Sequence, residues 1–192
     1  MAKAAKKSAA KRILILTGDC AESLEVMYPL QRLREAGFVP EIATPHGKVV
    51  RSVVHDFEPE FETYTEKPGY RIAADLSFDM VKPDLYAGLV IPGGRAPEYI
   101  RNESKALSIV AHFIETKKPI AAICHAALIL VAGGFCRGRT LAAYPALRMD
   151  VERAGGRFKD AEVVVDQNLV SARAWPDHPA FMREFLKLLD VK

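Results

Sequence analysis

The sequence predicts an α/β protein with an open, mostly parallel, doubly wound sheet that helices cover on both faces. Short, continuously apolar runs alternate along the chain with longer segments of helical periodicity. This alternation is typical of parallel strands joined by crossover helices. Several apolar runs lead directly into small or polar residues, as strands do where they leave a sheet. The chain has 192 residues, of which 49% are hydrophobic, enough to bury a core on both faces of a sheet.

The elements follow from these runs in chain order. The apolar runs predict strands at residues 12–17, 39–44, 86–91 and 119–123, and shorter strands near 140–143, 162–165 and 169–172. Helical periodicity predicts helices at about 22–36, 104–116, 125–132 and 179–189. Pro29 fits the first helix only near its first turn or at a kink. Residues 45–75 contain several Pro and Gly breakers and predict an inserted loop or hairpin.

Charge is unevenly distributed along the chain. Five basic residues and no acid occupy positions 1–12 and contribute +5 to a net charge of +3, so the rest of the chain carries −2. We predict that residues 1–11 form a disordered basic tail and that residues 12–192 form a single domain. A mildly acidic domain lacks the basic surface that nucleic-acid binding requires, so we expect no nucleic-acid partner.

Cysteine use and hydropathy favour a cytoplasmic protein. Three cysteines, an odd number at no metal-ligand spacing, argue against a disulfide framework and for a reducing compartment. No apolar run is long enough to cross a bilayer, and the basic N-terminus lacks the apolar stretch of a secretory signal. We therefore expect no membrane partner. Four further histidines are scattered at His46, His55, His112 and His178, and we expect neither a metal nor another cofactor.

Three strand ends carry residues that point to chemistry. They lie at residues 19–22, 92–94 and 123–125, and ligands collect at the carboxyl ends of parallel strands. The last has the layout of a nucleophile elbow, because the small residues Ala122 and Ala126 flank Cys124 two positions on either side. Such a turn places Cys124 at a helix N-terminus, where the helix dipole favours the thiolate. The alternative is that Cys124 is a small buried hydrophobe, the usual role of an unpaired cysteine.

Glycines and glutamates at the other two strand ends can complete a site. Gly93 and Gly94 can present N–H groups that, with the N–H of His125, would form an oxyanion hole. On the simpler interpretation the two glycines form a tight turn. Glu22 and Glu25 share one helix face, where a carboxylate either favours the helix dipole or serves as proton acceptor and partner to the nucleophile.

The other cysteines and the tryptophan have simpler interpretations. Cys20 follows the first strand and is either a resolving thiol for Cys124 or an inert loop residue. Cys136 lies among Gly and Arg residues and is predicted at a turn. Trp175 is predicted to pack over the sheet edge.

Three segments carry a family likeness, in this order along the chain. Residues 90–98 are Val-Ile-Pro-Gly-Gly-Arg-Ala-Pro-Glu, residues 122–125 are Ala-Ile-Cys-His, and residues 138–145 are Gly-Arg-Thr-Leu-Ala-Ala-Tyr-Pro. With these motifs the chain resembles the PfpI/ThiJ-like superfamily from residue 12 to about 189. That group contains intracellular protease I, the Parkinsonism-associated deglycase and cofactor-independent glyoxalase III enzymes. The resemblance implies a flavodoxin-like sheet of the class I glutamine-amidotransferase type.

The resemblance also implies roles for the residues that match the family's motifs. It makes Cys124 the nucleophile, His125 the histidine that follows it, and Gly94 with the His125 N–H the oxyanion donors. Glu98 matches a glutamate that, in the protease-like branch, reaches the histidine of a neighbouring subunit. We therefore expect a homodimer or a higher homo-oligomer whose site is completed across an interface.

Three further positions match the pocket of the family. Glu25 matches the acid that contacts the nucleophile, Glu22 matches a second acid of the same pocket, and Tyr144 matches a pocket tyrosine. The chain departs from the family's pattern in two places. Ala126-Ala127 replaces the usual Gly-Pro, which bears on backbone freedom at the elbow. The 45–75 segment is longer than in the plain protease branch and looks like that of the glyoxalase-like members.

Three functions remain open on these observations. The favoured one is a cysteine-dependent, cofactor-independent enzyme for 2-oxoaldehydes such as methylglyoxal, or for their glycation adducts on proteins. The second is a PfpI-type cysteine peptidase, with Cys124 as nucleophile, His125 as base and Glu98 as orienter from a neighbouring subunit. The third is a redox sensor or stress chaperone that uses oxidation of Cys124.

Overall fold

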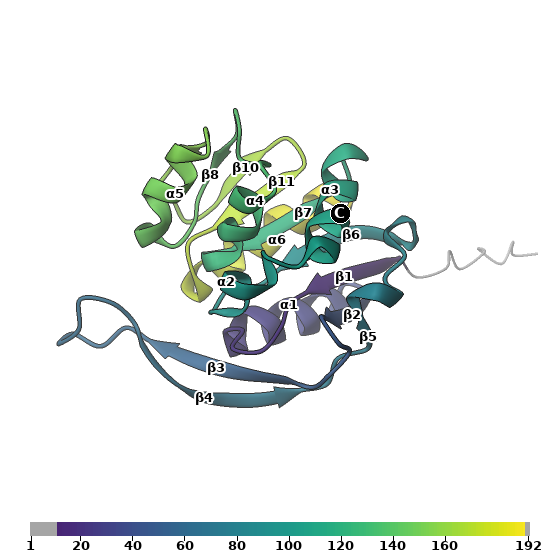
Figure 1. Cartoon of the computed structure of the whole chain (residues 1–192), viewed down its shortest axis with the longest axis horizontal. Coiled ribbons are helices and arrows are strands. Elements are labelled where there is room, and N and C mark those ends of the chain that lie inside the picture. Colours follow the sequence, from purple (N-terminus) through teal and green to yellow (C-terminus); the bar gives the residue numbers. More distant parts are fainter. Residues whose placement is uncertain (1–10, 191–192) are drawn as a thin grey trace, which may run out of the picture.

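A computed structural model describes residues 11–190, and the predicted basic tail lies outside the described residues except for Lys11. Its centre is a seven-stranded sheet in the order β10-β11-β7-β6-β1-β2-β5 (Figure 1). All neighbours pair in parallel except β10 and β11, which confirms the predicted α/β fold. The strands are β1 (Arg12–Leu16), β2 (Val39–Thr44), β5 (Leu76–Ser77), β6 (Tyr86–Ile91), β7 (Ile120–Ile123), β10 (Val164–Asp166) and β11 (Leu169–Ala172).

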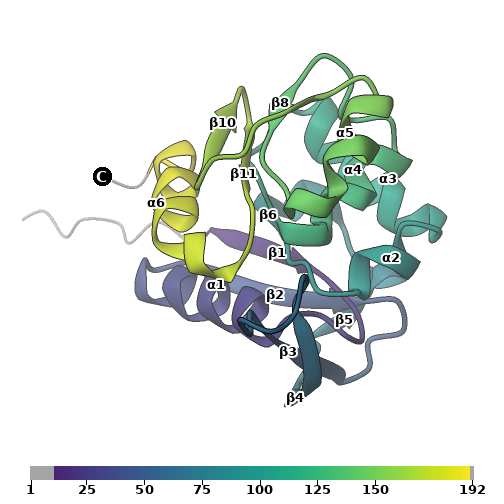
Figure 2. The same ribbon diagram turned by 90° about the vertical axis from the view of Figure 1, so that its left-hand side faces the viewer.

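Helices cover both faces of this sheet (Figure 2). One layer contains α1 (Ser23–Glu35) and α6 (His178–Leu188); the other contains α2 (Ala96–Ile100), α3 (Ser104–Glu115), α4 (Ala127–Ala132) and α5 (Arg148–Arg153). Alternate β1 residues face the two layers, because side chains alternate across a strand. Leu14 packs in a cluster with Phe113 of α3, whereas Ile15 packs with Phe181 of α6. The sheet is therefore buried on both faces.

Two smaller pairs of strands lie outside the main sheet. The 45–75 segment contains an antiparallel hairpin of β3 (Val50–Asp56) and β4 (Thr65–Ile72), whose loop extends away from the body (Figure 1). Its stem is fixed to the start of α1, where the Ser23 hydroxyl donates to the Val53 carbonyl over 2.8 Å. The second pair, β8 (Thr140–Leu141) with β9 (Arg157–Phe158), is parallel. The predicted strand near 140–143 is thus not part of the main sheet.

The structure tests several further sequence-based expectations. Pro29 lies inside α1 and is buried, past the first turn, and a kink at this residue stays a prediction. The helix continues beyond Pro29, and its buried face packs on β2 and α6. The short helices α2 and α5 were not predicted, since each spans too few residues for a periodic pattern. Cys136 lies in a turn, as predicted, and its side chain is 1% exposed and packs in the core. Among residues 11–190, no helix is both long and apolar enough to cross a membrane.

Candidate active site

The nucleophile elbow forms where β7 ends. Cys124 has a φ of 59°, in the left-handed region that a residue with a Cβ seldom adopts, and it begins a 3₁₀ turn over Cys124–Ala126. This turn leads directly into α4. Ala126 and Ala127 have φ values of −53° and −55°, ordinary for a helix and close to the φ of proline. The Ala-Ala pair thus fits this elbow without backbone strain.

Glu22 and Glu25 have different roles at the start of α1. Glu22 is the N-cap residue, and its Oε2 accepts a hydrogen bond from the Glu25 N–H over 2.8 Å. The Glu25 side chain points to the opposite strand ends, where its Oε2 accepts from the Gly93 N–H over 2.7 Å. Glu22 therefore caps the helix, whereas Glu25 is directed into the site, where its role as proton acceptor stays a prediction.

Both carboxyl groups are buried and favour their protonated forms. Glu22 is 1% exposed and Glu25 is fully buried, and Oε1 of each has no hydrogen-bond partner among the described residues. Burial raises the pKa of Glu22 to about 7. Burial, with the charge of Glu22 added, raises the pKa of Glu25 to about 8. Loss of water disfavours the charged carboxylate, so each group can hold or release a proton near neutral pH.

Gly93 allows Glu25 and Cys124 to meet. A Cβ atom at this position would lie 2.5 Å from the Cys124 Cβ and 2.6 Å from the Glu25 Oε2, closer than non-bonded atoms approach. Because the Gly93 N–H is already bonded to Glu25, it does not serve as the predicted oxyanion donor. Gly93 contributes to the site through its lack of a side chain.

The backbone N–H groups of Gly94 and His125 are directed at the sulfur of Cys124, and both lower its pKa. Burial of Cys124 and the charge of Glu25 act more strongly in the opposite direction, so the pKa of the thiol is raised. The expected thiolate-favouring effect of the helix N-terminus is thus outweighed by desolvation. The two N–H groups predicted as oxyanion donors thus both face the sulfur of a cysteine whose pKa is raised, and their role as oxyanion donors stays a prediction.

His125 and Tyr144 form the other side of the site. The His125 Nδ1 lies 3.3 Å from the Cys124 Sγ, and the imidazole stacks on the ring of Tyr144 with centroids 5.0 Å apart. Burial lowers the pKa of His125 to about 4, so the imidazole is neutral at physiological pH. The predicted pocket tyrosine is therefore brought against the predicted histidine.

The hairpin supplies a second layer of residues that the sequence analysis missed. Tyr64 lies edge-on to His125 at 5.9 Å between centroids, and it stacks on His55 at 4.1 Å. The His55 Nε2 lies 3.0 Å from Oε2 of Glu66, and Glu66 also forms an ion pair with Arg95. The valines at 49, 50, 53 and 54 were the signal for a strand that would carry His55 to this place.

Two predicted residues lie at the edge of the site. Glu98 is exposed in the first turn of α2, and its charge contributes to the raised pKa of Tyr64; its contact with a neighbouring subunit stays a prediction. Cys20 is partly buried with a φ of 60°, and its Sγ lies 3.4 Å from Nη2 of Arg95. Its role as a resolving thiol also stays a prediction. In residues 11–190, no group of three or more His, Cys, Asp or Glu side chains is arranged to hold a metal ion.

Known proteins share this fold and these motifs. Residues 11–188 match the profile of the DJ-1/PfpI family. The chain is 40% identical to Protein DJ-1 homolog D of Arabidopsis thaliana over 95% of its own length and 48% of that protein, so it spans about half of this relative. It is 43% identical to Deglycase TK1284 of Thermococcus kodakarensis over 93% of this chain and 99% of that one.

A solved structure of a similar protein shares the three-dimensional fold of this chain. The crystal structure of a two-domain protein from Anabaena variabilis, with DJ-1/ThiJ/PfpI-like and ferritin-like domains, superposes with a TM-score of 0.81. It is 26% identical in sequence and covers 94% of this chain and 48% of that one. On its motifs, its elbow and these relatives, the chain belongs to the DJ-1/PfpI family.

Proposed function

We propose that the protein is a cysteine-dependent enzyme that acts on 2-oxoaldehydes such as methylglyoxal or on their glycation adducts, without a cofactor. The observation that carries the proposal is the contact of Cys124 with the buried carboxyl group of Glu25, whose pKa is about 8. Glu22, whose pKa is about 7, lies next to Glu25 and caps the same helix. Proton transfer is most efficient when the pKa of the catalytic group is near the working pH. A relative named as a deglycase, at 43% identity, supports the same chemistry.

The reaction on methylglyoxal begins with addition of sulfur to the aldehyde. In the fraction of the protein in which Glu25 is ionised near neutral pH, its carboxylate accepts the thiol proton. The Cys124 thiolate then attacks the aldehyde carbon to form a hemithioacetal. The developing oxyanion accepts hydrogen bonds from the N–H groups of Gly94 and His125. Glu25 returns its proton to this oxyanion and becomes a carboxylate again. It then takes the proton of the former aldehyde carbon, which gives an enediolate, and returns that proton to the neighbouring carbon. Water cleaves the resulting thioester and releases the hydroxy acid with the free thiol.

The peptidase alternative receives less support from the same site. A Cys-His peptidase needs a histidine that holds the proton of the thiol in a thiolate–imidazolium pair. Burial lowers the pKa of His125 to about 4, which disfavours the imidazolium. The buried carboxyl of Glu25 is the better proton acceptor at neutral pH.

The test is consumption of methylglyoxal without glutathione or added metal, by the wild type, by Cys124→Ala and by the matched control Cys20→Ala. We expect the wild type and Cys20→Ala to consume the aldehyde and release lactate, and Cys124→Ala to lose this activity. Equal consumption by all three proteins, or by none, would reject the proposal. Peroxide oxidation of Cys124 in a protein that consumes no aldehyde would support the redox-sensor alternative.

We also propose that Glu98 completes the site across a homodimer. Its exposure at the start of α2 leaves its carboxylate accessible to a neighbouring subunit, and the effect of its charge on Tyr64 of the same chain places it near the site. Analytical ultracentrifugation gives the oligomeric state, and Glu98→Gln is expected to lower activity only in the associated form. A fully active monomer would contradict the proposal.

A further inference from the structure

A cavity lies beside the active site, between the hairpin loop and residues 173–177. Its volume is about 610 Å³, within the range of about 300–1,000 Å³ typical of sites for ligands much larger than a three-carbon aldehyde. We call it the hairpin groove. Its lining is Phe57, Glu58, Pro59, Phe61, Glu62, Thr63, Tyr144, Pro145, Asp160, Arg173, Ala174, Pro176 and Asp177.

The groove shares one wall with the active site. The Tyr144 ring lines the groove and stacks on His125, while its backbone N–H donates to the Cys124 carbonyl over 3.3 Å. The hydroxyls of Thr63 and Tyr144 lie 3.1 Å apart, so the hairpin and the body meet at this wall. An extended ligand in the groove would therefore reach the Tyr144 ring, which stacks on the histidine beside the nucleophile.

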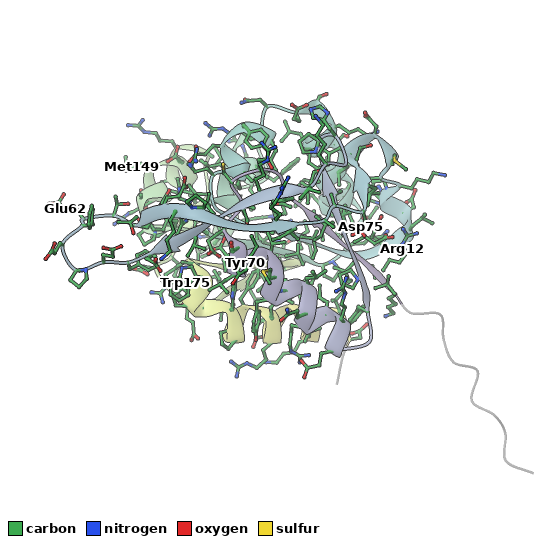
Figure 3. The ribbon with its side chains drawn as sticks, turned by 90° about the horizontal axis from the view of Figure 1, so that it is seen from below. Arg12, Glu62, Tyr70, Asp75, Met149 and Trp175 are labelled. Carbon is green, nitrogen blue, oxygen red and sulfur yellow. The ribbon has the colours of Figure 1, made fainter. Side chains whose placement is uncertain are left out.

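Exposed aromatic rings form the apolar part of the groove. Phe57 and Phe61 are 51% and 56% exposed, and Phe57 lies against Trp175 with ring centroids 5.9 Å apart. Large aromatic side chains gathered at an exposed site mark a binding surface. Glu62 lies at the outer end of the hairpin loop, and Trp175 lies beside the hairpin on the body (Figure 3).

The charged residues of the groove leave an excess of carboxylate. Four acidic residues and one basic residue line it. The single guanidinium, Arg173, is already bound by Asp160 and by Asp177. Glu58 and Glu62 of the loop are exposed and line the groove. Neither is paired with Arg173, the one basic residue of the lining. Carboxylates beside aromatic faces attract ammonium and guanidinium groups through charge and cation–π interactions.

We propose that the hairpin groove binds a lysine- or arginine-bearing peptide segment, and that adducts flanked by cationic residues on proteins are preferred substrates of Cys124. The proposal rests on the proposed function for the reaction and on the groove for the choice of substrate. Glu58 and Glu62 recognise the cation, while Phe57 and Phe61 contact the stem of the side chain. The segment then passes Tyr144 to reach the elbow.

The kinetic test uses two cysteine peptides of equal length, each carrying the methylglyoxal hemithioacetal and flanked by either lysines or glutamates. We expect kcat/KM for the lysine peptide to exceed that for the glutamate peptide by about tenfold or more, a ratio that salt lowers. The double variant Glu58→Gln/Glu62→Gln is expected to bring this ratio close to one. The matched control Glu60→Gln lies in the same loop, outside the lining, and is expected to keep the wild-type ratio.

Binding separates this proposal from the proposed function. Trp175 is the only tryptophan of the chain, so its fluorescence reports occupancy of the groove in Cys124→Ala without turnover. We expect the unmodified lysine peptide to change this fluorescence and the glutamate peptide to leave it unchanged. If methylglyoxal is consumed but the lysine peptide neither reacts faster nor binds better than the glutamate peptide, the groove proposal is wrong and the proposed function stands. A fluorescence change with protein concentration alone would show a second copy in the groove and overturn the proposal.

Discussion

Replacing Glu25 with glutamine should change how stability depends on pH. The folded pKa of Glu25 is about 8, against an ordinary value of 4.5, so above the ordinary value the folded protein keeps a proton that the unfolded chain has released. The stabilisation from this proton is fully present below the unfolded pKa and is lost as pH rises through the folded pKa. Glutamine has almost the same shape, can accept from the Gly93 N–H, and does not ionise.

The size of the effect follows from the shift. A pKa difference of one unit corresponds to about 1.4 kcal/mol. Between about pH 6.5 and about pH 8.5, the wild type should therefore lose about 2 kcal/mol of unfolding free energy that Glu25→Gln retains. The difference between the two proteins also includes the interaction of the Glu25 charge with Glu22 and with Cys124.

Urea denaturation of both proteins at the two pH values measures this difference. Glu35→Gln is the matched control, because Glu35 ends the same helix with its side chain 75% exposed, and it should show the pH dependence of the wild type. At neutral pH, Glu25→Gln should also lower kcat/KM for methylglyoxal about a hundredfold or more, the usual contribution of a general base. Parallel pH dependence in the wild type and Glu25→Gln would refute the reasoning from burial.

Three further substitutions test the structure. Gly93→Ala should destabilise the fold by several kcal/mol, because its Cβ would meet the Cβ of the nucleophile at 2.5 Å; unchanged thermal unfolding would contradict this. Glu66→Gln should cost about 1 kcal/mol at neutral pH. Pairing with Arg95 lowers the pKa of Glu66 to about 2, so the cost should shrink as pH falls below 4.5, as acid titration would show. Phe181→Ala should cost about 3–5 kcal/mol in chemical denaturation, since Phe181 is fully buried.

The central sheet and the elbow were accessible from sequence because their signals are local. The run at residues 119–123 is apolar throughout, as a strand buried on both faces must be, and the small residues around Cys124 sit within two positions of it. The convergence of three strand ends followed from topology, since parallel strands end at one edge of a sheet. These predictions needed no knowledge of distant contacts.

The second layer of the site was not predictable in the same way. Tyr64 and His125 are 61 positions apart in the sequence, yet their rings are in contact. No local sequence pattern predicts such a contact. Breakers such as Pro59 and Pro68 made the hairpin look irregular, although Pro68 lies within β4. The raised pKa of Cys124 also escaped prediction, because a helix dipole can be inferred from sequence while the depth of burial cannot.

Unfavourable features of this molecule are concentrated where the chemistry is proposed. Cys124 holds a left-handed backbone conformation, and two buried carboxyl groups each leave one oxygen without a partner among the described residues. Such features persist only where the surrounding fold over-determines them, here through a sheet covered on both faces. Selection for stability alone would therefore replace the residues of this site first. Substitutions at the site that raise thermal stability should also abolish turnover.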